Sequence, residues 1–252
     1  MKRALALYAV AAYAFLHLPL LVLAAFSFNR SRFMRWEGFS LEWYQAAFSN
    51  LQLMEGASNS LLIAAIATIL STAIGVLGAY GLWRRRSRFL SASLYLSLLT
   101  PEIVTGVSLL VFFQWIFRVL DIRLGMHTVI LAHVAFSIAY VVVVILARLQ
   151  TMDATLLEAA LDLGASPSEA FRRVILPVLG PAVAAASLLA FTVSFDDYVI
   201  TSMVAGVDSE TLPMAIYAIA RRGSSPVLNA ISTLIVAGLG FLTLASERLR
   251  RR

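Results

Sequence analysis

The chain has 252 residues, of which 60% are hydrophobic and 13% charged, and its net charge is +6. Soluble domains average about 45 to 50% apolar and about 25% charged residues, so this composition excludes an ordinary water-soluble globule and indicates a chain embedded in a lipid membrane. The lack of cysteine excludes a disulfide framework and a catalytic thiol, and the single lysine, Lys2, excludes a Walker A loop among these residues.

Six stretches with few or no charged residues approach or exceed the roughly 20 residues that cross a bilayer. They are residues 5–28, 60–83, 89–117, 125–147, 174–195 and 223–246, and the third contains one acid, Glu102. Because unpaired backbone groups are costly in lipid, each stretch is predicted to be a helix. The first is longer than the apolar core of a removable signal, about 7 to 15 residues, so we expect a retained anchor. The sequence therefore predicts one all-α polytopic domain over residues 1–252.

Basic residues are distributed unequally between the connecting segments. With the N-terminus inside, the segments predicted to be cytoplasmic hold 13 lysines and arginines, and the outer segments hold seven. The positive-inside rule therefore favours cytoplasmic N- and C-termini. Residues 29–59 then form an outer loop, and residues 148–173 form a cytoplasmic loop. Because topology accounts for the basic charge, we expect no nucleic-acid partner.

The cytoplasmic loop predicts two short helices joined by a turn. Its first helix has an apolar stripe and a polar face at helical spacing; the stripe is Leu156, Leu157, Ala160 and Leu161, and the face is Thr155, Glu158 and Asp162. Gly164 is suited to end this helix, and Ser166, Pro167 and Glu169 form a capping signal for the next. Pro177 and Pro181 are expected to interrupt the chain before the fifth crossing. The acidic face argues against a DNA-binding helix-turn-helix and favours a protein partner.

The segments Glu158-Ala159-Ala160, Leu163-Gly164-Ala165 and Leu176-Pro177 resemble the EAA loop of ABC importer permeases, which have the MetI-like fold. The resemblance implies a type I importer permease whose coupling helices rest in a cytoplasmic ATPase dimer. ATP and Mg would bind to that dimer, so this chain would be no enzyme and hold no cofactor. The contact would be carried by Glu158, Ala159, Ala160, Asp162, Gly164 and Ala165. The alternative is a helical hairpin that packs only on its own subunit.

Motifs outside the loop resemble the second permease subunit of spermidine/putrescine importers. They include Ser27-Phe28-Asn29, Trp43-Tyr44, Pro101-Glu102-Ile103-Val104, His133 and Ser194-Phe195-Asp196-Asp197. The resemblance implies polyamine import by alternating access in a bacterial inner membrane. A homologous permease and a periplasmic binding protein would be the further partners, and the two permeases usually form a heterodimer. Two alternatives stay open: the same fold with another cargo, such as an organic cation, an amino-acid derivative or an opine, and a channel or scaffold without an ATPase.

Carboxylates inside membrane helices are costly and therefore indicate function. On continuous helices, Glu102 and Asp196 would lie about 20 Å and about 22 Å above the helix starts, hence at similar height. No basic residue in any crossing is available to neutralise them or Asp197, so a cationic substrate is expected to do so. Ser194 would add a hydroxyl. Alternatively, the two aspartates mark the solvent-exposed end of the fifth helix, and Glu102 pairs with a hydroxyl group or with a companion subunit.

A tryptophan, the histidines and several glycines lead to further expectations. Trp43 could stack on a cation at the outer mouth, with membrane-interface anchoring as the alternative. The histidines, His133 among them, lack metal-ligand spacing, so they are expected to hydrogen-bond between helices and no metal site is predicted. Gly75, Gly78 and Gly81 predict close helix contacts.

Overall fold

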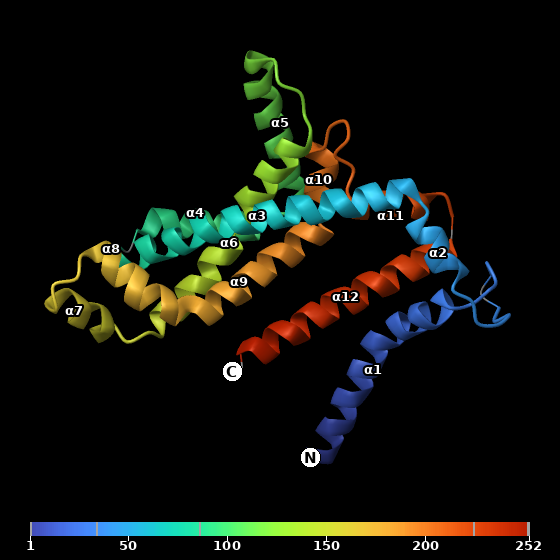
Figure 1. The fold of residues 1–252 in the computed structure, drawn as a ribbon, viewed down its shortest axis with the longest axis horizontal. Coiled ribbons are helices and arrows are strands. Elements are labelled where there is room, and N and C mark those ends of the chain that lie inside the picture. The colour runs from blue at the N-terminus through green and yellow to red at the C-terminus, as the bar shows by residue number, and fades with distance from the viewer. Residues whose placement is uncertain (1, 34, 86, 224, 251–252) are drawn as a thin grey trace. The chain divides into compact units, whose positions relative to one another are not determined.

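The computed structural model describes residues 2–33, 35–85, 87–223 and 225–250, and these ranges are largely helical (Figure 1). The helices are α1 Lys2–Ser27, α2 Glu42–Phe48, α3 Leu51–Arg84, α4 Arg88–Leu99, α5 Glu102–Leu120, α6 Met126–Gln150, α7 Thr155–Asp162, α8 Pro167–Ala170, the π-helical turn η1 Phe171–Ile175, α9 Leu176–Asp196, α10 Val199–Val204, α11 Leu212–Arg221 and α12 Pro226–Arg250. Residues 1, 86, 251 and 252, which bear on the predicted charge count and on the placement of the termini, lie outside the described residues.

Among the described residues, five helical segments are long and apolar enough to cross a membrane. They are Leu5–Ser27, Leu51–Arg84, Glu102–Leu120, Met126–Gln150 and Pro167–Asp196. The sixth predicted crossing corresponds to α12, whose described apolar part, Pro226–Phe241, is shorter than a full span. The predicted all-α polytopic architecture is confirmed.

The third predicted crossing, residues 89–117, is not one helix, and this expectation was wrong. Helix α4 ends at Leu99, Thr100 and Pro101 are extended, and α5 begins at Glu102. The ring of a proline disfavours helical geometry in the preceding residue, and here Thr100 has ψ 128°. The height calculated for Glu102 from a continuous helix therefore does not apply.

One of the two compact units of the chain contains residues up to Glu55 together with residues 214–245. Its outer loop is organised by Asn29, which is fully buried. The Asn29 side-chain amide donates to Arg35 O at 2.7 Å, and its Oδ1 accepts from Glu37 N at 2.9 Å. The Trp43 indole N–H donates to Asn29 O at 2.7 Å. One buried asparagine thus fixes the loop between α1 and α2.

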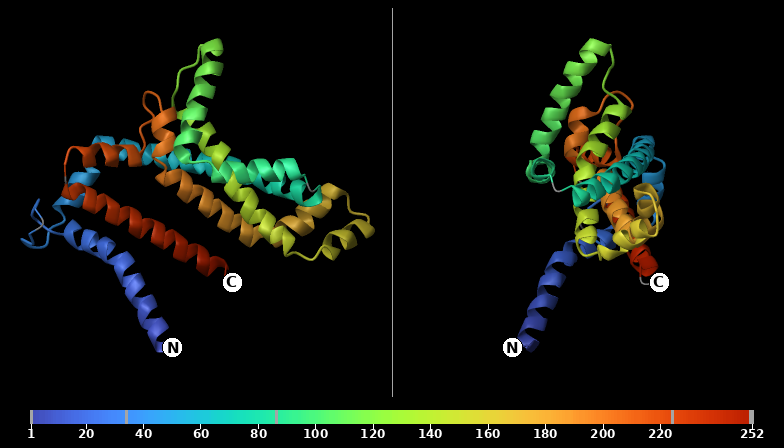
Figure 2. Two further views of the ribbon diagram at one scale, coloured as in Figure 1. Left: turned by 180° about the vertical axis from the view of Figure 1, so that it is seen from behind. Right: turned by 90° about the vertical axis from the view of Figure 1, so that its left-hand side faces the viewer.

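The other unit contains residues 56–213 and is built around α6 and α9, which pack along each other. Figure 2 shows α5 extending away from this pair in both views. Gly75 of α3 allows close packing on α6, because a methyl group there would lie 2.6 Å from Val141 Cγ1. The predicted close contact is therefore confirmed at Gly75. At Gly81, by contrast, the described residues leave open space within 4 Å, so that expectation was wrong.

The fifth crossing is continuous with the second short helix of the loop 148–173. Capped α8 passes through η1 into α9, and α9 runs on through Pro181. The chain therefore stays helical through Pro177 and Pro181, but it is not regular there: a π-helical turn precedes Pro177, and the ribbon changes direction between α8 and α9 (Figure 1). Prolines are tolerated in membrane helices when neighbouring turns adjust in this way.

Candidate functional site

A pocket of about 290 Å³ lies where α4, α5, α6, α9 and α10 converge. It is lined by Ser97, Leu98, Thr100, Glu102, Thr105, Phe136, Tyr140, Val193, Asp196, Asp197, Tyr198, Val199 and Ile200. The structure thus brings the three predicted carboxylates to one pocket. The lining contains no lysine or arginine, so its formal charge is negative.

Glu102 and Asp196 reach the pocket from opposite kinds of helix end. Glu102 is the first residue of α5, where the positive end of the helix dipole stabilises a carboxylate. Asp196 is the last residue of α9, where the dipole is unfavourable for negative charge. Both side chains are exposed to the pocket. A cation between them would gain from both carboxylates and would relieve the repulsion at Asp196.

The Asp197 carboxylate, unlike that of Asp196, accepts hydrogen bonds from another residue. Its Oδ2 accepts from Thr201 N and from Thr201 Oγ1, both at 2.7 Å, and lies 3.4 Å from His133 Nε2. Its side chain is only 6% exposed. The carboxylate therefore caps the first turn of α10, a role that the sequence analysis did not find.

Ser194 and Trp43 do not line this pocket. Ser194 is buried, and its hydroxyl is 2.7 Å from His133 Nδ1. Trp43 belongs to the other unit, and its indole N–H is already bonded to Asn29. Its ring also carries the Arg32 guanidinium, with Cζ 5.7 Å from the ring centroid. Their predicted part in a substrate pathway stays a prediction.

Sequence analysis missed the aromatic wall of the pocket. Phe136 and Tyr140 come from α6, and Tyr198 comes from the segment between α9 and α10. The available signal was the spacing of His133, Phe136 and Tyr140, which places all three on one face of a helix. Aromatic faces beside carboxylates are suited to bind organic cations.

Residues 148–173, predicted to be cytoplasmic, form the predicted helical hairpin. Gly164 has φ +85°, and the Gly164 and Ala165 N–H groups donate to Leu161 O at 2.9 Å and Ala160 O at 3.1 Å. This pair of bonds is a Schellman motif, which ends α7 at the predicted glycine. The predicted capping box is also confirmed, since Ser166 N donates to Glu169 Oε2 at 3.0 Å and Glu169 N donates to Ser166 Oγ at 3.4 Å.

Capping also fixes the start of α7. Asp153 Oδ1 accepts from Thr155 N at 3.0 Å, and this backbone hydrogen bond holds the pKa of the Asp153 carboxyl below its usual value. The Asp153 carboxylate is therefore charged at neutral pH and caps the first turn of the helix.

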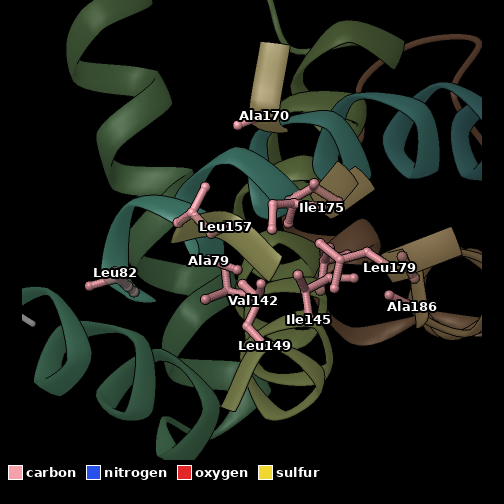
Figure 3. Close-up of a cluster of buried hydrophobic side chains, with 13 residues drawn as sticks. Ala79, Leu82, Val142, Ile145, Leu149, Leu157, Ala170, Ile175, Leu179 and Ala186 are labelled. Carbon is pink, nitrogen blue, oxygen red and sulfur yellow. The ribbon is translucent and has the colours of Figure 1, made fainter. Parts of the chain in front are cut away.

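The two faces of α7 differ from the predicted division. Leu157 is 4% exposed and lies in the apolar cluster drawn in Figure 3, with Leu149 of α6 and Ile175 of η1. Leu156, predicted in the same stripe, is exposed instead. With Ala159 and with Leu163, which is 89% exposed, it forms an outward apolar row at helical spacing.

The remaining predicted coupling residues lie on or near the outward surface. Glu158, Asp162 and Gly164 are exposed, and Ala160 and Ala165 are half-buried. The outward face is therefore apolar and acidic, and not acidic alone as predicted.

Among the described residues, no group of three or more His, Asp or Glu side chains could hold a metal ion. His133 bonds to Ser194 and Thr201 side chains from α9 and α10, so the expected interhelical hydrogen bonding is confirmed for this histidine.

A helical membrane bundle with an acidic pocket and a capped surface hairpin is compatible with a transport permease. Residues 71–251 match the family described as the inner membrane component of binding-protein-dependent transport systems, and the chain belongs to this family. It is thus a multi-pass inner-membrane protein and a transport subunit.

Relatives match over nearly the whole chain. The chain is 40% identical over 245 residues to the spermidine/putrescine transport system permease protein PotC of Escherichia coli (strain K12), covering 96% of this chain and 91% of that protein. It is 38% identical over 237 residues to the putrescine transport system permease protein PotI of the same strain, covering 91% and 84%.

Solved structures share the fold at low identity. A chain of a bacterial ABC transporter that imports alginate matches with a TM-score of 0.73 at 14% identity, covering 98% of this chain and 95% of that one. A chain of the MetNI methionine ABC transporter matches with a TM-score of 0.68 at 19% identity, covering 79% and 94%. These matches confirm the expected MetI-like permease fold.

Proposed function

We propose that this chain is the permease subunit through which an ABC importer moves polyamines, such as putrescine and spermidine, into the cytoplasm. The observation that carries the proposal is the pocket with two exposed carboxylates, three aromatic side chains and no basic residue in its lining. A polyamine carries several separated ammonium groups, so it can neutralise Glu102 and Asp196 together. The similarity to PotC and PotI, whose names state this cargo, supports the assignment.

Energy coupling would pass through the α7–α8 hairpin. Leu156, Ala159 and Leu163 offer an apolar row, and Glu158 and Asp162 lie on the same exposed helix. An amphipathic helix of this kind fits a groove in a partner protein. The partner is an ATPase dimer that binds ATP and Mg, and this chain contributes no bond chemistry. The coupling set predicted from sequence, including Ala160, Gly164 and Ala165, is kept in this proposal.

Two further partners complete the importer. A second, homologous permease would form a heterodimer with this chain, and a periplasmic binding protein would deliver the cargo. Both termini would be cytoplasmic, as the distribution of basic residues predicts. Closure of the ATPase dimer would then open the pocket alternately to the two sides of the membrane.

The test is uptake of labelled putrescine and spermidine by vesicles that contain the complete importer and loaded binding protein. Glu102→Gln and Asp196→Asn each remove one charge with little change in shape. Each is expected to lower uptake about tenfold, because one ammonium loses a partner in a partly desolvated pocket. Glu42→Gln, an exposed acid at the start of α2, is the matched control and should leave uptake unchanged.

The outcomes separate the proposal from its rivals. Unchanged uptake in both pocket variants contradicts the role of the pocket. Uptake of a different cargo, found by screening organic cations, amino-acid derivatives and opines against the cognate binding protein, replaces the polyamine. Failure to co-purify with any ATPase favours a channel or scaffold.

A further inference from the structure

A buried polar network lies directly beside the acidic pocket and ties three helices together. Its centre is His133 of α6, which is 1% exposed. His133 Nδ1 lies 2.7 Å from Ser194 Oγ of α9, and Nε2 lies 2.9 Å from Thr201 Oγ1 of α10. Nε2 is also 3.4 Å from Asp197 Oδ2. The Phe136 ring, which lines the pocket, lies 5.2 Å from the imidazole.

One hydrogen-bond pattern that fits these distances begins at Asp197. A carboxylate only accepts, so Thr201 donates its single hydroxyl proton to Asp197 Oδ2 at 2.7 Å. In the His133 tautomer with its proton on Nε2, the Thr201 oxygen accepts from Nε2–H and Nδ1 accepts from the Ser194 hydroxyl. This arrangement satisfies every polar group of the network, which is what a buried site requires.

The network gives two adjacent carboxylates different tasks. Asp197 accepts two hydrogen bonds from Thr201, and its φ of −65° and ψ of 125° turn the chain from α9 into α10. Asp196 is exposed, and among the described residues its carboxylate hydrogen-bonds only to its own backbone. The corner held by His133 therefore leaves one aspartate open to the pocket and keeps the other bound to α10.

We propose that His133 is a positioning residue for transport: by holding Ser194 and Thr201 it fixes the α9–α10 corner, so that Asp196 presents a free carboxylate while Asp197 stays bound to α10. The inference rests on the proposed function of the pocket and deepens it. Losing the His133 contact to Thr201 loosens the corner, so that Asp197, whose carboxylate is then held by α10 alone, becomes more available to bind cargo. Cargo is then held more tightly and leaves more slowly, because passage requires binding weak enough for release.

Two substitutions of His133 separate the two halves of the network. His133→Asn retains a polar group near the Nδ1 position, facing Ser194, and loses the donor to Thr201. His133→Gln retains a donor near the Nε2 position. In vesicles with the complete importer, His133→Asn should lower polyamine uptake per ATP hydrolysed about tenfold. His133→Gln should restore uptake to within about threefold of the wild type. His17→Asn, the same change on an exposed residue of α1, is the control.

ATP hydrolysis distinguishes positioning from a general structural role. ATPase activity stimulated by loaded binding protein should remain within about twofold of the wild type in every variant that assembles. Parallel loss of uptake and ATPase activity overturns the inference, since it indicates a structural role alone. Wild-type uptake in both His133 variants overturns it as well.

A second measurement, thiol labelling, requires no cargo. It is possible because the chain contains no cysteine, so an introduced cysteine is the only thiol that reacts. The thiol of an Asp196→Cys variant should react readily with a water-soluble thiol reagent. The thiol of an Ile200→Cys variant, which leaves Asp197 intact and lies in the first turn of α10 at a position 3% exposed, should react slowly, and about tenfold faster when His133→Asn is added. An unchanged rate at position 200 overturns the inference. If wild-type vesicles take up no polyamine, the proposed cargo is wrong, and this labelling still decides whether His133 holds the corner.

Discussion

Replacing Leu157 with alanine tests whether α7 is held to the membrane unit by one buried side chain. Leu157 packs with Leu149 and Ile175, both fully buried. Removing a buried leucine side chain costs about 2–5 kcal/mol. Helix α7 has eight residues, fewer than the about 12 to 15 that give marginal stability to an isolated helix. A loss of about 2 kcal/mol therefore raises the detached population of α7 about 30-fold.

Amide hydrogen exchange measures this population directly. In Leu157→Ala, amides of α7 should exchange about 30-fold faster, while those in the middle of α6 should change much less. The matched variant is Leu163→Ala, which removes an exposed leucine from the same hairpin. It should leave exchange unchanged and should instead weaken ATPase binding, by up to the about 1.5–3 kcal/mol gained on burying a leucine. Equal exchange in the wild type and Leu157→Ala would refute the reasoning.

Three smaller changes give further expectations. Gly75→Ala should destabilise the protein by about 1–3 kcal/mol through overpacking, whereas Gly81→Ala should be neutral or stabilising by up to about 1 kcal/mol, as thermal unfolding in detergent would show. Gly164→Ala should cost about 1 kcal/mol, because its positive φ disfavours a Cβ, and should lower stimulated ATPase activity; equal activity would contradict this. The Asp153 cap has a lowered pKa, so its contribution is complete above the unfolded value of 3.8 and is lost as pH falls through the lower folded value. Circular dichroism of the wild type and Asp153→Asn should differ above this pH range and converge at its acid end.

The sequence was a reliable guide where the chain's own chemistry determines structure locally. Gly164 and the Ser166–Glu169 pair sit where left-handed geometry and reciprocal capping need them, so both ends of the hairpin turn could be predicted. The apolar stretches likewise predicted most of the membrane helices. In each case, the residues that determine the local structure lie close together in the sequence.

Tertiary contacts decided the features that were missed. Leu156 and Leu157 are adjacent leucines that the sequence pattern places in one apolar stripe, yet only Leu157 packs against α6 and η1. Asp196 and Asp197 are chemically identical, and Thr201 and His133 distinguish them through bonds from two other helices. Pro101 in the sequence could have predicted the helix break before α5. A proline alone does not decide this, however, because membrane helices also tolerate proline, as α9 does at Pro181.

The unbroken passage from α8 through η1 into α9 has a mechanical consequence. Residues 167–196 form one helical run of 30 residues, but the run is not straight, because the ribbon changes direction between α8 and α9 (Figure 1). Its two ends are Pro167, in the α7–α8 hairpin, and Asp196, at the acidic pocket. No loop lies between them, so a displacement of the hairpin passes to the carboxylate through helical backbone, and the bend is where part of that displacement is absorbed.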